Sequence, residues 1–217
     1  MACHVAGDLV VIGKDGAPIA RLSSVQDARP LGNPNDISSD GAGGAFLSDS
    51  GTFAPDAPAD GRVLWLSPQL ELHEVATDLH YPNGVAFDPA TNSLFVAEHL
   101  GRRVLRFQLE AANRVVSRTT YFDFAQHPET APWMTWLVGP DGIRLLPNGA
   151  LPVAFYGMGK IGVIDRCLQL QLLAAPAPYV TSVGALGGRL AIAAATDIRR
   201  PHGGVIRIGP LPDTETC

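Results

Sequence analysis

Four short polar segments, each followed by an apolar strand pattern, recur along the chain at similar intervals. They are NPND, YPNG, GPDG and VTSV, and their equivalent residues Asn35, Asn83, Asp141 and Ser182 are 48, 58 and 41 residues apart. Each segment opens a unit of apolar runs separated by Gly, Pro, Asn and Asp, which is typical of short antiparallel strands. A four-stranded unit that repeats roughly every 40 to 50 residues predicts an all-β fold, the β-propeller.

The repeat also predicts the domain organisation. We expect one propeller domain over residues 1–217, with blade units at approximately 1–30, 31–78, 79–137, 138–178 and 179–217. The longest interval reflects an insertion around HPETAPWMTW. No segment keeps helical spacing of apolar residues over three turns, and 23 glycines and 18 prolines separate the short runs.

Composition excludes several classes of protein. The 16 Lys and Arg residues against 21 Asp and Glu give a net charge of −5 without a long basic cluster, so nucleic acid is not an expected partner. No apolar run approaches the length of about 20 residues that a membrane helix needs. The first residues, MACHVAGDLVVIG, lack the pattern of a signal peptide. We therefore expect a soluble, cytoplasmic protein whose three cysteines are free thiols.

Three of the repeated polar residues form the candidate site. The first strand of each propeller blade lines the central channel, so Asn35, Asn83 and Asp141 should converge on the axis although they are far apart in the chain. Each could alone be an ordinary turn residue, because Asn, Asp and Gly tolerate positive φ. Three oxygen-bearing side chains in equivalent positions favour a site instead. Amide and carboxylate oxygens are ligands that suit a hard cation such as calcium.

Two further groups are weaker candidates. Glu98 and His99 are an acid and a base side by side, but neighbours on a strand point to opposite faces, so we do not expect this pair to be part of a site. Trp133, Trp136 and Tyr121 flank the insertion. They could form a lid over the channel or simply pack the loop onto the propeller, and the second interpretation is preferred.

The repeated segments resemble a known family. NPNDISSDGAGGAFLSD, YPNGVAFDPATNSLFVAE, GPDGIRLLPNGALPVAFYGMGKIGVID and VTSVGALGGRLAIAAATD, followed by GGVIRIG, are similar to the senescence marker protein/gluconolactonase family, which includes regucalcin and bacterial sugar lactonases. They cover nearly the whole chain in the family's order. The resemblance implies a six-bladed propeller that hydrolyses lactones and binds a divalent metal in its channel. Calcium is the expected ion, with Zn²⁺, Mn²⁺ and Mg²⁺ as alternatives.

The resemblance also implies roles for individual residues. Asn83 matches the family's metal-binding asparagine, and Asp141 matches the aspartate that is both metal ligand and catalytic base. Asn35 matches an asparagine of the substrate pocket, and Asn33 stands beside it where the lactonases often carry arginine. No carboxylate in SGTFAPDAP matches the family's substrate-binding glutamate. The substrate, a small lactone or ester, is therefore expected to differ from the aldonolactones.

The start of the chain departs from the family. Its members contribute a further metal-ligand glutamate from the first blade, and no residue here matches it, because residues 1–23 already resemble the outer part of the second blade. Six blades need roughly 240 to 300 residues. The expectation is therefore an N-terminally incomplete propeller of about four and a half blades, whose open edges favour self-association.

Three functions stay open at this stage. The first is a metal-dependent hydrolase of lactones or related esters, and the second is a non-catalytic or inactive propeller that serves as a binding module. The third follows from the likeness of PNGVAF, LFVAEH and RVLRF to strictosidine-synthase-like propellers.

Overall fold

The computed structural model describes residues 1–25, 29–197 and 204–210, and no helix occurs among them. The strands are β1 (Ala2–Cys3), β2 (Asp8–Ile12), β3 (Pro18–Leu22), β4 (Pro34–Ser39), β5 (Ala45–Asp49), β6 (Gly61–Leu66), β7 (Leu72–Leu79), β8 (Pro82–Asp88), β9 (Ser93–Glu98), β10 (Arg103–Ala111), β11 (Arg114–Asp123), β12 (Gly139–Ile143), β13 (Leu151–Tyr156), β14 (Lys160–Ile164), β15 (Leu170–Ala174), β16 (Tyr179–Leu186), β17 (Arg189–Ala195) and β18 (Gly204–Pro210). All described pairings are antiparallel and mostly join consecutive strands.

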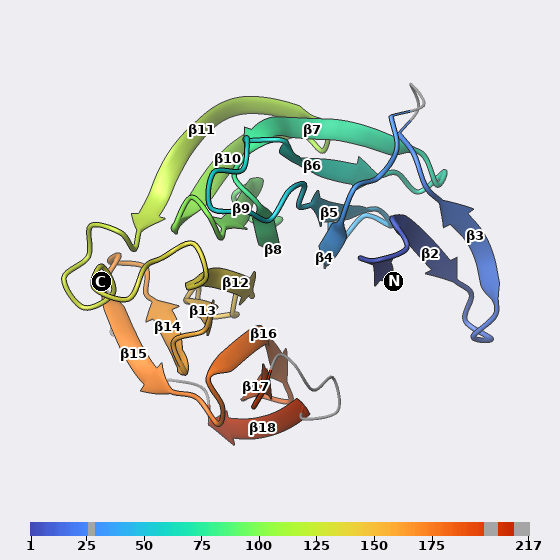
Figure 1. Ribbon diagram of the computed structural model, residues 1–217. Coiled ribbons are helices and arrows are strands. Elements are labelled where there is room, and N and C mark those ends of the chain that lie inside the picture. Colours follow the sequence, from blue (N-terminus) through green and yellow to red (C-terminus); the bar gives the residue numbers. More distant parts are fainter. Residues whose placement is uncertain (26–28, 198–203, 211–217) are drawn as a thin grey trace.

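The strands form sheets that follow one another along the chain. β1–β3 make a three-stranded sheet, and β4–β7 and β8–β11 each make a four-stranded sheet. A seven-stranded sheet contains β12–β18, but its two halves, β12–β15 and β16–β18, share the single residue pair Tyr156 and Tyr179. The sheets are arranged around a common centre, with β4, β8, β12 and β16 innermost (Figure 1). The predicted all-β propeller fold is confirmed, while the limits of the domain stay a prediction.

A break in register near its start interrupts each of the four inner strands. The breaks lie between Pro34 and Ile37, Pro82 and Val85, Pro140 and Ile143, and Val180 and Ser182. A β-bulge of this kind redirects side chains away from the regular alternation of a strand. The repeated polar residues lie at these breaks inside β4, β8, β12 and β16 and are therefore strand residues, not turn residues. Positive φ occurs at Tyr81 (56°) and not at Asn83 or Asp141.

The glycines that follow Asn83 and Asp141 permit close approach of neighbouring inner strands. A Cβ atom added to Gly84 would lie 2.4 Å from the backbone nitrogen of Ile143 and 2.5 Å from the carbonyl oxygen of Asp141. The repeated Asn-Gly and Asp-Gly pairs therefore place a polar side chain next to a residue without a side chain, where the neighbouring strand can come close.

We expect Gly84→Ala to destabilise the fold by about 1–3 kcal/mol, because the added methyl group overlaps backbone atoms that cannot rotate away. Chemical denaturation measures the free energy of unfolding. Gly184→Ala is the matched control, since Gly184 lies in β16 and no atom is within 4 Å of its added Cβ. Equal stabilities of the two variants would show that the inner strands are not packed this closely.

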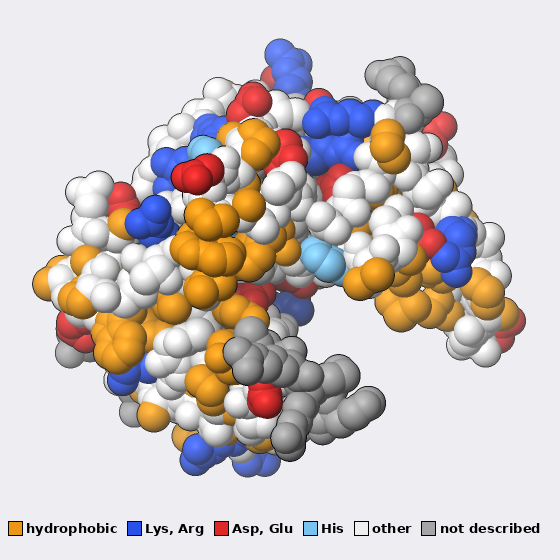
Figure 2. All heavy atoms as spheres, in the orientation of Figure 1, with side chains coloured by type: hydrophobic (Ala, Val, Ile, Leu, Met, Phe, Trp, Pro, Cys, Tyr) orange, Lys and Arg blue, Asp and Glu red, His pale blue; other side chains and the backbone are white. Residues whose placement is uncertain are grey.

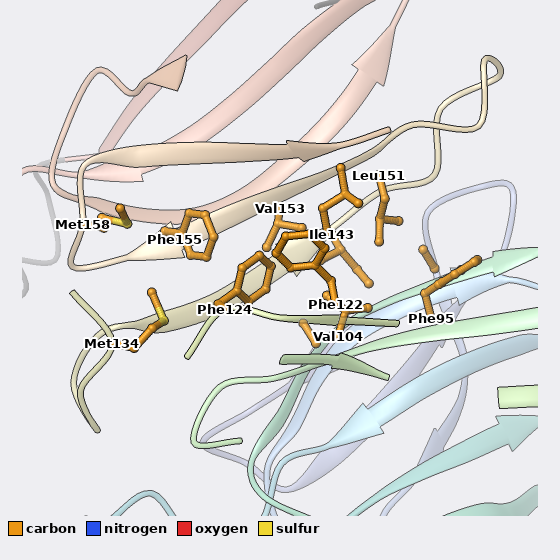
Figure 3. Close-up of a cluster of buried hydrophobic side chains, with 13 residues drawn as sticks. Phe95, Val104, Phe122, Phe124, Met134, Ile143, Leu151, Val153, Phe155 and Met158 are labelled. Carbon is orange, nitrogen blue, oxygen red and sulfur yellow. The ribbon is translucent and has the colours of Figure 1, made fainter. Parts of the chain in front are cut away.

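A buried hydrophobic cluster joins the β8–β11 sheet to the β12–β15 sheet. Phe95, Val104, Phe122, Ile143, Leu151, Val153 and Phe155 are among its members (Figure 3). Phe124 and Met134, from the segment between β11 and β12, belong to the same cluster and are buried. The insertion is therefore anchored in the core at its start and near its end, which positions the part that lies between Met134 and β12.

Two expectations concern the environment of the protein. Cys3 is a free thiol but Cys167 is disulfide-bonded, so the expectation of free thiols is wrong at Cys167. An odd number of cysteines argues against a framework of several bridges but not against a single bridge.

Within the described ranges, the structure has no helix that is long and apolar enough to cross a membrane. The cytoplasmic location stays a prediction.

Self-association also stays a prediction, and the exposed side chains of the first and last sheets support it. Ile12 and Ile19 are exposed on β2 and β3, and Ile206 and Ile208 are exposed on β18. Exposed apolar groups on sheet edges favour pairing with another chain. We expect light scattering to give a mass above that of the monomer. Ile206→Lys should lower this mass if β18 takes part, and a monodisperse monomeric wild type would contradict the prediction.

Candidate active site

A cavity of about 620 Å³ lies where the inner strands converge. Its lining consists of His4, Asn35, Asp36, Phe53, Tyr81, Asn83, His99, Asp141, Gly142, Tyr156, Thr181 and Ser182. All four equivalent residues of the sequence repeat are among them. Figure 2 shows hydrophobic side chains gathered near the centre of one face of the molecule, beside the open side of the ring. The structure thus brings Asn35, Asn83 and Asp141 together in one cavity, while their roles stay predictions.

Asn83 is held rigidly in the wall of this cavity. Its carbonyl oxygen accepts a hydrogen bond from the Ser48 hydroxyl, and the Ser50 hydroxyl donates to the carbonyl oxygen of Pro82 at 2.7 Å. The side chain is 5% exposed, yet its Oδ1 atom has no hydrogen-bond partner among the described residues. Burying an amide oxygen without a hydrogen-bond partner costs free energy of folding. A cation or a hydrogen-bond donor that binds this oxygen would therefore stabilise the arrangement.

Asp141 contributes a carboxyl group to the same cavity. Burial raises the pKa of this carboxyl well above its usual value, and the nearby Asp36 raises it further, whereas the backbone N–H of Gly142 acts in the opposite direction. Strongly perturbed carboxyl groups in a cavity are typical of functional sites, although structural networks also produce them. A bound cation beside Asp141 would favour its ionised form.

Asp36 was not identified from the sequence as a site residue. It follows Asn35 within the bulge of β4, and its carboxylate accepts hydrogen bonds from the backbone N–H groups of Val85 and Ile37 at 3.1 and 2.8 Å. Burial raises the pKa of Asp36, and these two donors with Arg144 offset part of that effect. Asp36 therefore ties β4 to β8. Its place after Asn35, where the second and third motifs have glycine, was the available signal.

The two asparagines of the first motif are placed differently. Asn35 lines the cavity, and its side-chain amide donates to the Ser50 hydroxyl at 3.1 Å. Asn33 is not part of the lining, and its amide donates to the carbonyl oxygen of Gly51 at 2.7 Å. The geometry supports contact between Asn35 and a bound molecule. A role of Asn33 in substrate binding stays a prediction, and here its side chain supports the loop after β5.

Glu98 and His99 diverge, as their adjacent positions predicted. Glu98 is fully buried at the end of β9, where it accepts a hydrogen bond from the N–H of His80 at 2.8 Å and pairs with Arg103 at 2.5 Å. His99 instead lines the cavity and is 2% exposed. Burial lowers the pKa of His99 to about 4, although backbone carbonyl groups nearby favour the protonated form. His99 is therefore neutral at physiological pH.

Aromatic side chains form another part of the lining, and the sequence pattern did not indicate most of them. Burial raises the pKa of Tyr81 and of Tyr156, and the charge of Asp141 raises both further. Both phenols therefore stay protonated and lie within electrostatic reach of Asp141. Tyr81 adjoins the Pro-Asn-Gly motif, but Tyr156 ends β13 and has no distinguishing pattern. Only the packing of the sheets around the common centre brings it to the cavity.

The residues of the insertion separate into two groups. The Trp136 ring lies 5.5 Å from that of Phe53, which lines the cavity, so Trp136 extends the cavity wall. Tyr121 packs at 4.9 Å against Phe95 in the β8–β11 sheet, and Trp133 is half exposed outside the lining. Tyr121 is thus a residue of β11 that packs within its own sheet, whereas Trp136 lies beside the channel.

The oxygen donors of the cavity fit a hard cation. The described residues contain no group of three or more His, Cys, Asp and Glu side chains that could hold a metal ion, so a cation here would also need amide or water oxygens. Calcium accepts amide, carboxylate and water oxygens. The unpartnered Oδ1 of Asn83 and the carboxylate of Asp141 are donors of this type.

Comparison with proteins of known sequence gives a family match. Residues 2–192 match the family model described as SMP-30/Gluconolactonase/LRE-like region. An uncharacterized protein of Sulfolobus acidocaldarius is 27% identical over 208 residues, which is 93% of this chain and 70% of that protein. The match extends over most of the strands that form the cavity.

Comparison with solved structures gives the same fold. A luciferin-regenerating enzyme superposes with a TM-score of 0.72 at 20% identity, covering 97% of this chain and 73% of its own. A calcium-binding protein, regucalcin, from Agrobacterium tumefaciens gives 0.71 at 16% identity, with 97% and 77% covered. A gluconolactonase from Xanthomonas campestris gives 0.69 at 23% identity, with 93% and 64% covered. Because the match to the family model covers far more than half of the sequence, this chain belongs to the SMP-30/gluconolactonase/LRE-like family.

Proposed function

We propose that the protein is a metal-dependent hydrolase of lactones or related esters. The observation that carries this proposal is the unpartnered, buried Oδ1 of Asn83 in the same cavity as the carboxyl of Asp141. Membership of a family that includes gluconolactonases supports the reaction class. The names of the similar structures, a gluconolactonase and a calcium-binding regucalcin, support both hydrolysis and a divalent cation.

Asn83 and Asp141 would hold the cation, and calcium is the ion that their oxygen donors fit best. Zn²⁺, Mn²⁺ and Mg²⁺ are the alternatives. When bound, a divalent cation polarises a carbonyl group and lowers the pKa of water. Its positive charge also offsets the burial that raises the pKa of Asp141, so that this carboxylate is ionised in the loaded protein.

Residues of the cavity have separate roles in the proposed reaction. Asp141 accepts the proton of the attacking water while the water oxygen bonds to the lactone carbonyl carbon. The ring C–O bond then breaks, and the leaving oxygen takes up the proton, which gives a hydroxy acid. Asn35 orients the ring or its substituents through its amide. Direct base catalysis by Asp141 is one form of this mechanism. In the other, a cation held by Asn83 and Asp141 would supply the activation of the water.

The experiment is a lactone hydrolysis assay of the purified protein with calcium and with a chelator. We expect activity that the chelator removes and calcium restores, and Asp141→Ala should lack it. Equal activity of the wild type and Asp141→Ala would overturn the proposal. Zn²⁺, Mn²⁺ and Mg²⁺ are tested in the same assay, because the choice of ion depends on ligand number and geometry.

A non-catalytic binding module is the second candidate. The observation that favours it is that Asn83 and Asp141 are only two protein donors, and no larger group of metal-ligating His, Cys, Asp and Glu side chains occurs in the described part of the chain. This candidate predicts no calcium binding at tens of micromolar in a calorimetric titration. Tight binding of calcium that Asn83→Ala weakens would favour the hydrolase.

A further inference from the structure

One wall of the cavity is aromatic. The Phe53 ring lies 4.8 Å from that of Tyr81, 5.3 Å from that of His99 and 5.5 Å from that of Trp136, measured between ring centroids. Tyr156 continues the wall, with its ring 6.1 Å from the His99 imidazole. These residues come from the loop after β5, the turn before β8, the turn after β9, the insertion and the end of β13. Five separate segments thus build one continuous aromatic surface.

The outer part of this wall is accessible to solvent. Phe53 is 41% exposed and Trp136 is 37% exposed, although each packs against the other. Exposed aromatic surface beside polar groups in a cavity is typical of a ligand-binding site. Flat rings also prefer to stack on or against other rings, which gives this surface a chemical preference.

The charges of the cavity select against an anionic ligand. Among its described lining residues none is Lys or Arg, whereas both Asp36 and Asp141 contribute carboxyl groups. His99 is neutral, and Arg144, which acts on Asp36, is exposed and outside the lining. A divalent cation on Asn83 and Asp141 would be balanced by the two carboxylates. No fixed positive charge then remains for the carboxylate or phosphate of a substrate.

The aromatic wall meets the polar part of the cavity at two tyrosines. Tyr81 and Tyr156 both belong to the wall, and both line the same cavity as Asp141. A ring that stacks on Phe53 therefore lies in the cavity that holds the Asp141 carboxyl group. The volume of about 620 Å³ is within the range of small-molecule cavities.

We propose, building on the hydrolase function above, that the substrate is an uncharged lactone or ester with an aromatic or similarly flat apolar substituent that stacks on Phe53. The polyhydroxylated lactones of sugar acids fit this wall poorly, because its aromatic rings offer few hydrogen-bond partners to their hydroxyl groups.

The first test compares kcat/KM for γ-phenyl-γ-butyrolactone and for glucono-δ-lactone in calcium-containing buffer. We expect the phenyl lactone to be preferred, and Phe53→Ala to lower its kcat/KM roughly 10- to 100-fold with little effect on glucono-δ-lactone. Phe53→Leu, which keeps apolar volume without a flat ring, should give a smaller loss. Trp133→Ala is the matched control, because Trp133 is exposed but lies outside the cavity lining.

A binding measurement separates this inference from the proposed reaction. Calorimetry with the phenyl-substituted γ-lactam, which resists hydrolysis, reports ring binding without turnover. Binding that Phe53→Ala weakens, in a protein that hydrolyses no lactone, would support the aromatic site and overturn the hydrolase. Preferred hydrolysis of glucono-δ-lactone with no effect of Phe53→Ala would overturn the aromatic site and support the hydrolase.

Discussion

Replacing Asp141 by asparagine is expected to lower kcat/KM for lactone hydrolysis roughly a hundred- to ten-thousandfold, the usual contribution of a positioned acid or base. Asparagine has nearly the same shape as aspartate, so the cavity keeps its form while the site loses its proton acceptor. The amide oxygen can still approach a cation, but it carries no charge. Calcium binding, measured by calorimetry, should therefore weaken in the same variant.

The stability of this variant distinguishes lost chemistry from lost folding. Burial and Asp36 raise the pKa of Asp141 in the folded protein, so in metal-free buffer the folded state binds this proton more tightly than the unfolded state. Such a group destabilises the fold increasingly as pH rises above its unfolded pKa. Asp141→Asn should therefore be at least as stable as the wild type at neutral pH.

The control for Asp141→Asn is Asp88→Asn at the end of β8. Asp88 accepts a hydrogen bond from the backbone N–H of Ala90 at 3.0 Å in its own turn and does not line the cavity. We expect its activity to equal that of the wild type. A fully active Asp141→Asn, or a control that loses activity to the same extent, would show that Asp141 has no catalytic role.

Replacing Phe155 by alanine is expected to destabilise the protein by about 3–5 kcal/mol, the usual range for a buried phenylalanine. Phe155 is fully buried in β13, and its ring makes an edge contact at 4.8 Å with Phe124, which leads into the insertion. The surrounding cluster joins two sheets, as Figure 3 shows, so the cavity left by the ring cannot close without moving a whole sheet. Thermal unfolding should shift downward by roughly 6 to 20 °C.

Phe155→Leu is the companion variant, because leucine keeps much of the buried apolar volume and should cost clearly less. Phe53→Ala should leave thermal stability nearly unchanged, since Phe53 is partly exposed at the cavity. A loss for Phe155→Ala no larger than that for Phe53→Ala would contradict the assignment of Phe155 to the core. The activity of Phe155→Ala is informative as well, because Tyr156 follows it and lines the cavity.

Repetition made the fold and part of the site predictable. Asn35, Asn83 and Asp141 occur at corresponding points of a four-stranded unit, and a propeller places such points around one axis. The bulges were not predicted. Pro-Asn-Gly and Pro-Asp-Gly resemble ordinary turns in sequence, and the register of a strand depends on its partner rather than on its own residues.

The sequence by itself determined the all-β propeller and the convergence of three polar side chains. The reason is that each sequence repeat folds into one blade, and the blades are arranged around a common axis. Only the tertiary structure decided which other residues join them. Phe53 lies in a loop, and His99 and Tyr156 lie at or just after the ends of the second strands of their blades, where the residue type does not repeat. These segments meet only when the sheets pack side by side. Such contacts arise from packing between segments distant in sequence, for which local patterns carry no signal.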